Sequence, residues 1–269
     1  MTVKPNSKKL AALYEKYGII VILILEVIFF SIKSPTFLKL DNILLVSRQV
    51  SFYGIAAVGM TMVLLVGEID ISVGSILAFS GCLSAVLITK AAVPVALACL
   101  IAIVISTFFG LLSGTLTTVC KVPSLIATLA MQIIIKGCTY LMTGGTAVSG
   151  LPDNFKFMGQ GFLLGRIPVP VVIWLVIFLL GLFVLNKTYI GRRIYAVGGN
   201  KEAARLSGIK TTGIVIGTFV CSAFVAGISG TLMAARLGSG MASVGSDFAM
   251  DVLTASVLGG VSLQGGKGN

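Results

Sequence analysis

The sequence predicts an all-α fold: a polytopic transmembrane helix bundle with about eight spans in a single domain, 1–269. Composition is the first observation. Hydrophobic residues make up 57% of the 269-residue chain, charged residues make up 11%, and the mean hydropathy is +1.06. A soluble domain carries about twice that share of charge. The second observation is a series of apolar runs, each close to the roughly 20 residues that a helix needs to cross a bilayer.

These apolar runs define the predicted spans in chain order. Each must be helical, because lipid offers no hydrogen-bond partners to backbone N–H and C=O groups. The spans are 17–32, 50–66, 71–89, 92–119, 123–142, 168–186, 212–235 and a last one that starts at about 248. The first span resembles a signal peptide, but "FFSIKSP" follows it in place of a small-residue cleavage site, so we expect it to stay uncleaved.

Lysines and arginines predict the orientation of the spans. The 187–210 loop carries six cations against one acid, and the N-terminal tail carries four lysines (Lys4, Lys8, Lys9 and Lys16) against Glu15. Loops rich in Lys and Arg stay on the cytoplasmic side of the membrane, so both segments are predicted to be cytoplasmic. An even number of predicted spans separates them, and the two assignments therefore agree. The segments 143–167 and 236–247 then face outward.

The segment 33–49, "KSPTFLKLDNILLVSRQ", fits this scheme less well, since it is basic but lies on the outward side. Its apolar spacing suits a surface-lying or re-entrant helix, with Asp41 as the N-cap. A different topology in this region is the alternative.

Residue usage excludes several kinds of chemistry. The chain has no histidine, which excludes Ser-His-Asp and Cys-His catalysis, His-based zinc sites and haem ligation by His. Five cysteines lie in or beside apolar runs without a C-x-x-C motif, so we interpret them as small buried hydrophobes. We expect neither an enzyme activity nor a metal site.

Glycine pairs at helical spacing predict faces where membrane helices pack closely. Gly110 and Gly114 form one such pair, and Gly213 and Gly217 form another, with Cys221 on the same face.

The 187–210 loop contains its own helix signals. Asn200 can cap a helix and Gly208 can end it, while Gly198-Gly199 provides a bend before it. Glu202 and Arg205 lie at the ends of this short helix that the helix dipole favours. So short a helix is marginal alone in water, so it needs a surface to rest on, either the bundle or a partner. The alternative is a basic loop that only fixes topology.

Three stretches together carry a resemblance to a known family: "GIAAVGMTMVLLVGEIDISVGS" (54–75), "YAVGGNKEAARLSGI" (195–209) and "ASVLGGVSLQGGKG" (255–268). The chain resembles permease subunits of bacterial ABC importers, in the branch that imports ribose and related monosaccharides. The "KEAA…G" core is similar to the EAA-type motif of their coupling loop, here 187–211. The resemblance extends over the whole chain.

The resemblance implies a set of partners in the bacterial inner membrane. A second permease subunit, identical or related, completes the pathway. Two cytoplasmic ATPase subunits dock on the coupling loops, and a periplasmic or lipoprotein sugar-binding protein delivers the substrate. ATP and Mg are expected to bind those ATPases, since "GGVSLQGGKGN" lacks the Ser or Thr of a P-loop and follows no strand. The permease itself then needs no cofactor.

The resemblance also implies site residues. In the coupling loop, the ATPase groove would take Gly199, Asn200, Glu202, Ala203, Ala204, Arg205 and Gly208. Small alanines allow close contact there, and the charges of Glu202 and Arg205 can pair with those of the partner.

A second candidate site is the interruption in "GEIDISVGS", at Glu68, Asp70, Ser72 and Gly74. Acids at membrane depth are costly and often functional, and a broken helix exposes N–H groups to polar ligands. This favours a place on the sugar pathway or its inner gate. The alternative is a cytoplasmic turn in which Asp70 or Ser72 only caps the next helix. Asp70 matches the family's acid, whereas many relatives have glycine at position 68.

Other polar residues leave a second function open, an ion-coupled secondary transporter that uses Glu26, Glu68 or Asp70. Gln132 and Asn154 are further candidates for contact with the sugar or its binding protein, and Lys136 can snorkel to the outer interface. Relatives continue beyond the last motif, so we expect that C-terminal spans are missing from this chain. The sequence does not identify the sugar.

Overall fold

The computed structural model describes residues 5–268, with side chains from Ile20 onward, and divides the chain into two compact units, 1–47 and 48–269. The charged tail that predicts a cytoplasmic N-terminus, Lys4 to Lys16, lies outside the described side chains. The fold is predominantly helical, as predicted, and among the described residues five helices are long and apolar enough to cross a membrane. They are α2 (Leu40–Leu65), α4 (Val95–Thr118), α5 (Ser124–Thr143), α7 (Val169–Lys187) and α10 (Thr211–Leu237).

The remaining elements are shorter or lie at the ends of the spans. The first helix, α1 (Pro5–Lys33), contains the first predicted span, and α3 (Val73–Thr89) is a short apolar helix. Strands β1 (Phe162–Leu163) and β2 (Ile167–Pro168) form an antiparallel pair after α6 (Asp153–Gln160). The others are α8 (Tyr189–Gly199), α9 (Lys201–Leu206), the 3-10 turn η1 (Ala242–Gly245) and α11 (Phe248–Leu258).

The start of α2 corrects the expected surface helix at 33–49. A turn after Lys33 precedes α2, which begins at Leu40 and continues without a break to Leu65. Asp41 lies in the first turn of α2 instead of capping a separate helix. The sequence pattern was misleading because residues 40–49 are more polar than the rest of the same helix.

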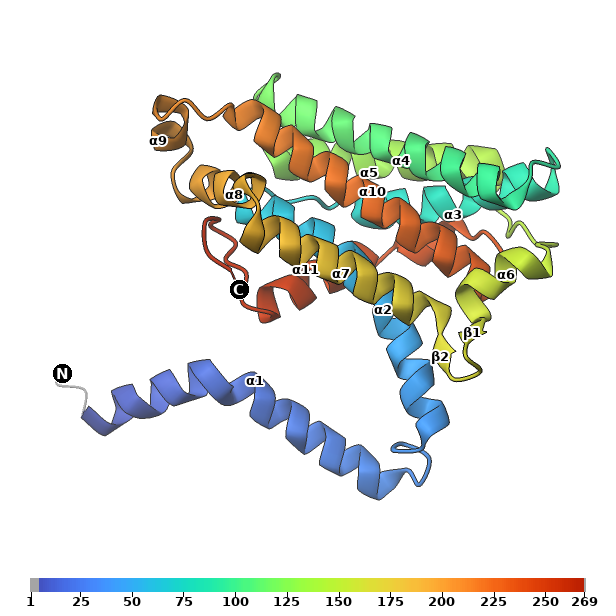
Figure 1. The fold of residues 1–269 in the computed structure, drawn as a ribbon, viewed down its shortest axis with the longest axis horizontal. Coiled ribbons are helices and arrows are strands. Elements are labelled where there is room, and N and C mark those ends of the chain that lie inside the picture. Colours follow the sequence, from blue (N-terminus) through green and yellow to red (C-terminus); the bar gives the residue numbers. More distant parts are fainter. Residues whose placement is uncertain (1–4, 269) are drawn as a thin grey trace. The chain divides into compact units, whose positions relative to one another are not determined.

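Helix α10 forms the centre of the second unit and packs against α3 and α4 (Figure 1). Small residues allow this contact, as predicted for the first glycine pair: Gly110 and Gly114 of α4 face the backbone of Phe219 and Ile216. No helix of the described chain packs on the second pair, since Gly213 and Gly217 face open space. A buried apolar cluster surrounds the contact between α3 and α10 and includes Phe52, Leu77 and Phe219.

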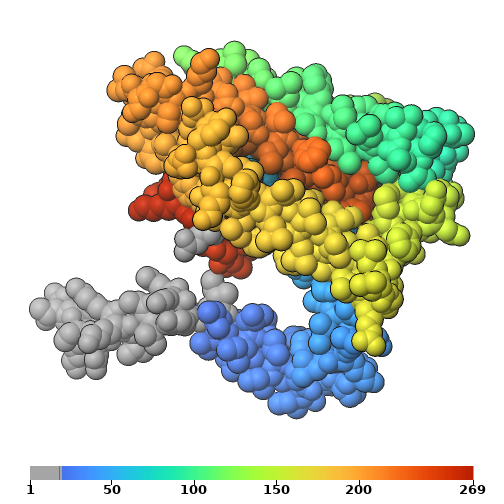
Figure 2. All heavy atoms as spheres, viewed as in Figure 1, coloured from blue at the N-terminus to red at the C-terminus, as the bar shows by residue number. Residues whose placement is uncertain are grey.

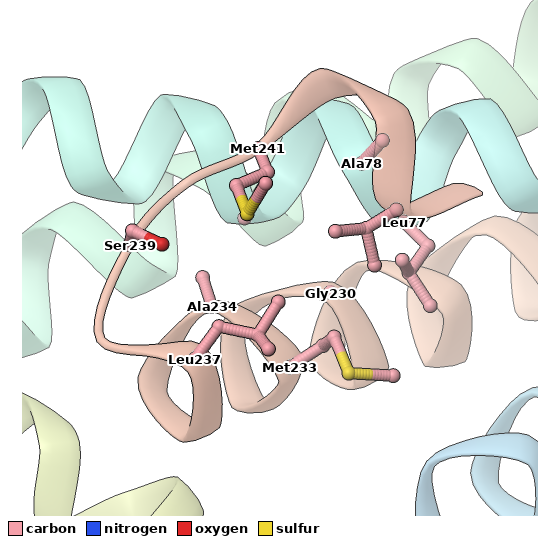
Figure 3. A pocket seen from close by; sticks show the side chains of 10 residues that line it. Leu77, Ala78, Gly230, Met233, Ala234, Leu237, Ser239 and Met241 are labelled. Atoms are coloured by element: carbon pink, nitrogen blue, oxygen red, sulfur yellow. The ribbon is translucent and has the colours of Figure 1, made fainter. Parts of the chain in front are cut away.

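The chain after α10 is the largest departure from the predicted topology. The segment 236–247 was expected to be an outward loop, yet most of it turns back and packs along α3 (Figure 3). A Cβ added to Gly240 would lie 2.9 Å from Cys82 Cα, and Gly245 packs directly on the backbone of Gly74. Hydropathy gives no signal here because the segment "GSGMASVGSD" owes its burial to small residues that permit close backbone approach.

At one end of the second unit, hydrogen bonds of Arg48 and Gln160 join α2, α6 and α10. The Arg48 guanidinium donates to the Gln160 carbonyl (3.0 Å), and the Gln160 side chain donates to the Arg236 carbonyl (2.9 Å). Arg48 thereby brings the start of the buried part of α2 to α6 and to the last turn of α10. Helices α8 and α9 lie at the other end of α10 (Figure 1).

Candidate functional site

The predicted coupling loop folds as two helices, where one was expected. Thr188 caps α8, since its hydroxyl accepts a hydrogen bond from the Gly191 N–H (3.3 Å). Ile194 and Val197 bury one face of α8 against the core. The recurrence of buried positions every three residues is the signal that could have revealed α8, but it extends over only three turns and two arginines, Arg192 and Arg193, interrupt it.

Helix α9 has the capping that the sequence predicted. The Asn200 side chain accepts a hydrogen bond from the Ala203 N–H (2.9 Å), and Gly208 ends the segment in a left-handed conformation (φ +82°). Ala204 is buried against the bundle, whereas Ala203 and its charged neighbours are exposed, and Gly199 borders open space. Ala204 is thus the one buried residue of α9, and the rest of the helix surface is exposed (Figure 2).

The charges of α9 pair with each other. The Arg205 guanidinium donates two hydrogen bonds to the Glu202 carboxylate, at 2.6 and 3.1 Å. These hydrogen bonds lower the pKa of Glu202 below its ordinary value. Both side chains are about two-thirds exposed. Exposed ion pairs contribute little to stability because water screens them, so these charges stay available to a partner.

The three stretches that carry the family resemblance converge beside α8. Gly198 packs against the Leu65 carbonyl at the end of α2, and the Gly266 N–H donates to that same oxygen (2.9 Å). The Tyr195 hydroxyl donates to the Gly268 carbonyl (3.3 Å). A side chain at position 198 would clash with this backbone. Segments far apart in the sequence thus form one layer at the base of the bundle.

The interruption between α2 and α3, which we call the 66–72 break, is organised by Asp70. Its carboxylate is fully buried and accepts hydrogen bonds from the Ser72 N–H (3.0 Å) and the Ser72 hydroxyl (2.5 Å). A third hydrogen bond comes from the Ser222 hydroxyl of α10 (3.0 Å). Asp70 therefore closes a turn immediately before α3 and ties the break to α10. The alternative in which Asp70 or Ser72 caps α3 was wrong, since the N-cap residue Ser72 makes no side-chain capping bond and Asp70 bonds only Ser72 and Ser222. The bond to Ser222 was not anticipated, because nothing distinguishes that serine from others on α10.

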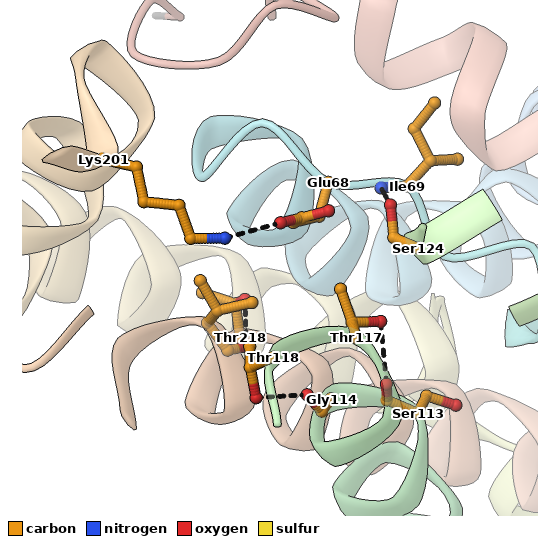
Figure 4. A network of polar contacts seen from close by, with 10 residues as sticks. Glu68, Ile69, Ser113, Gly114, Thr117, Thr118, Ser124, Lys201 and Thr218 are labelled. Carbon is orange, nitrogen blue, oxygen red and sulfur yellow. Dashed lines mark hydrogen bonds and ion pairs between the residues drawn. The ribbon is translucent and has the colours of Figure 1, made fainter. Parts of the chain in front are cut away.

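The acid Glu68 connects the 66–72 break to α9. Its carboxylate pairs with the Lys201 ammonium at 3.1 Å, and the Glu68 side chain is only 15% exposed (Figure 4). The break is also bound to α5, since the Ile69 N–H donates to the Ser124 hydroxyl (3.3 Å). A polar cleft of about 380 Å³ lies beside this pair, lined by residues that include Thr117, Lys121, Ser124 and Thr212. Sequence spacing could not pair Glu68 with Lys201.

Gly74, the last member of the predicted gate group, lies in the first turn of α3. The backbone around Gly245 and Ala249 packs against it so closely that no side chain fits. The two sets of predicted site residues, in the break and in the coupling loop, are thus brought together through Glu68 and Lys201. Ser72 and Gly74 face inward, away from α9.

Comparison with known proteins shows what the chain is similar to. Residues 42–266 match a family described as the permease component of branched-chain amino acid transport systems. The chain is 39% identical to the ribose import permease protein RbsC of Haemophilus influenzae, over 95% of this chain and 80% of the relative. It is 40% identical to that of Bacillus subtilis, over 94% and 79%. The L-arabinose ABC transporter permease protein AraH of Azospirillum brasilense is 37% identical, over 94% and 74%. No solved structure matches the chain.

Proposed function

The chain belongs to the family of permease components typified by branched-chain amino acid transport systems, and from this we propose that it is the membrane-spanning subunit of an ATP-driven importer of a monosaccharide. It is a multi-pass protein of the bacterial inner membrane and acts as a transport subunit, not an enzyme. The observation that carries the proposal is the capped, exposed helix α9, built from the motif that such permeases present to their ATPases.

The substrate class follows from the relatives and not from the family description. The relatives at 37–40% identity that we name are import permeases for ribose and L-arabinose, both five-carbon sugars. A xylose transport permease of Haemophilus influenzae is 30% identical. We therefore assign a pentose or a closely related sugar to this chain in preference to an amino acid.

The proposed partners are two ATPase subunits, a second permease subunit and an extracytoplasmic sugar-binding protein. The ATPase groove would receive the exposed residues of α9, with Glu202 and Arg205 available for charge pairing and Ala203 permitting close approach. The permease would bind no nucleotide itself, and ATP and Mg would be held by the ATPases. These assignments rest on the coupling-loop motif and its geometry.

The contacts of α8 and α9 suggest how ATPase movement would reach the pathway. Displacement of α9 would pull on Glu68 through Lys201, and displacement of α8 would press Gly198 on the end of α2. Both act on the 66–72 break, which Asp70 ties to α10. The break would then transmit the movement to the inner gate.

Co-purification tests the proposed docking. The permease is co-expressed with the ATPase subunits of its own transport system. We expect them to co-purify with the unaltered chain but not with a variant that carries Glu202→Lys and Gly208→Pro. The first change reverses a surface charge, and proline cannot adopt the positive φ of residue 208 or donate its bond to Arg205. Asp153→Lys, an equal charge change on α6, is the control. Retention of the ATPase by the double variant would contradict the proposal.

Uptake into proteoliposomes separates this function from ion-coupled transport. Radiolabelled D-ribose should accumulate only when ATP, the ATPases and the binding protein are present. Uptake driven by a proton or sodium gradient without ATP would instead favour the secondary transporter. The geometry offers that alternative little support, because Glu68 is paired with Lys201 and both Asp70 oxygens bind serines.

A further inference from the structure

The segment that follows α10 places irregular backbone deep in the bundle. Gly245 packs on Gly74, which lies in sequence between Asp70 and Ser80. The Asp70 carboxylate accepts a hydrogen bond from Ser222, and the Ser80 hydroxyl donates one to the Gly227 carbonyl. Ser222 and Gly227 both lie in the central turns of the 27-residue α10. Residues 240–247 therefore reach mid-depth without forming an α-helix. Irregular backbone occurs at membrane depth only where protein buries it or where it lines a water-filled cavity.

One side of this segment faces a polar groove. Its walls come from α3, α5 and the η1 region, and the lining residues are Ser75, Ala78, Gln132, Lys136, Thr139, Ala242, Gly245 and Ser246. Gln132 and Lys136 lie one turn apart on α5 and project to the same side. The neighbouring exposed positions of α5 are apolar, with Ile133 71% and Ile134 54% exposed. The polar residues thus form a stripe that is distinct from the lipid-compatible face.

Two exposed charges accompany this groove. Lys136 and Asp247 are both exposed, and neither forms an ion pair with any side chain from Ile20 to Gly268. Asp247 directly follows the groove residue Ser246 at the start of α11. A charge at this depth is costly in lipid and normally faces water or a bound partner. The cost predicts that this face of the bundle meets an aqueous pathway.

We propose that this groove is a sugar-contacting station of the translocation pathway, in which Gln132, Lys136 and Ser246 hydrogen-bond the hydroxyls of a monosaccharide. The inference rests on the proposed function and assigns residues to it. A sugar hydroxyl both donates and accepts hydrogen bonds. Lys136 supplies a donor, and the amide and the serine supply both donors and acceptors. Discontinuous helices at mid-depth are where transporters commonly bind their substrates.

The groove is closed in this conformation. It holds about 10 Å³, which is room for about one water molecule. Passage of a sugar therefore requires η1 and α5 to separate. The contacts that hold η1 are mainly small residues on α3, so this separation breaks few large apolar contacts.

Cysteine accessibility tests the proposal independently of transport. The exposed Cys120 and Cys138 are first replaced by serine. Single changes Gln132→Cys, Lys136→Cys and Ser246→Cys are then compared with Ile133→Cys and Ile134→Cys in the assembled transporter. We expect a membrane-impermeant thiol reagent to label the three groove positions at least tenfold faster than the two controls. D-ribose should slow labelling at positions 132 and 136.

The outcomes separate this inference from the proposed function. Labelling at 132 and 246 as slow as at 133 and 134 would overturn the inference, even with fast labelling at 136, since Lys136 would then only snorkel to the interface. Normal ATP-dependent D-ribose uptake with that result would leave the proposed function standing. The expected labelling without any D-ribose uptake would support an aqueous groove and count against the sugar assignment. Lys136→Met should reduce uptake at least tenfold while ATPase co-purification is unchanged.

Discussion

At the scale of single residues, Asp70 illustrates how a buried carboxyl group can be satisfied within a membrane bundle. Three hydrogen bonds from two serines surround its carboxylate, and none comes from a cation. The residue therefore fixes the position of the 66–72 break relative to α10, and the bond to Ser222 is the part of this arrangement that can be tested by removing one atom.

Ser222→Ala should destabilise the protein measurably. It removes one donor from a fully buried carboxylate, at a cost of about 1.5–3 kcal/mol, which lowers Tm by roughly 5 °C for a chain of this size. Thermal unfolding of the detergent-solubilised protein measures the shift. Ser106→Ala is the matched control, because the Ser106 hydroxyl is buried with no hydrogen-bond partner among the described residues. Its removal should leave Tm unchanged or slightly higher. Equal shifts for both variants would contradict the role given to Ser222.

At the scale of elements, the connection between α9 and the 66–72 break depends on one ion pair, Glu68–Lys201. Glu68 is largely buried, whereas Lys201 is half exposed. Because water screens the lysine, we expect the pair to contribute modestly to stability, about 1 kcal/mol or less. Its importance is geometric, since it joins the surface that we assign to the ATPase to the chain segment that leads into α3.

A charge exchange tests this connection. Glu68→Lys places two cations together and should uncouple the transporter, so that sugar uptake per ATP hydrolysed falls several-fold while the ATPases still co-purify. The exchange variant, with both Glu68→Lys and Lys201→Glu, should recover most of the coupling, because the attraction is restored. Lys210→Glu, a charge reversal outside the pair, serves as the control. No recovery in the exchange variant would show that the two residues act independently.

At the scale of the whole molecule, the sequence predicted the fold class and most of the spans. Predicted spans 71–89, 123–142 and 212–235 correspond to α3, α5 and α10 within two residues at each end. The hydrophobic runs suffice because lipid forces each into a helix. The short helix α9 was predicted because its cap and terminator are local signals.

Features that depend on packing were not predictable from one sequence. The path of residues 240–247 along α3 has no periodicity, because glycine and serine fill the contact instead of large apolar side chains. The partners of Asp70 and Glu68 are distant in the chain, and only the folded arrangement selects Ser222 and Lys201 from similar residues nearby. From the sequence, Gln132 on α5 was interpreted as a sugar-contact candidate and Lys136 as a snorkelling lysine. Only the structure shows that both line the same groove.

The topology itself makes a prediction for the whole bundle. Helices α9 and α6, which contain Ala203 and Asn154, lie at opposite ends of the second unit (Figure 1), so these residues should meet opposite sides of the membrane. In intact cells, an impermeant thiol reagent should label Asn154→Cys in the Cys120→Ser, Cys138→Ser background, whereas Ala203→Cys should react only after the membrane is permeabilised. Labelling of Ala203→Cys in intact cells would invert the topology and remove the basis for ATPase docking.

The compactness of the segment from Gly199 to Gly208 bears on how importers of this kind diversify. Its capping bonds are internal, and only Ala204 is buried beneath it. On the proposed docking, recognition of the ATPase motor would be encoded in one stretch of surface, apart from the residues that would select the sugar cargo. Exchange of this stretch between homologous permeases could reassign the motor without altering the cargo, so the two specificities are free to evolve separately.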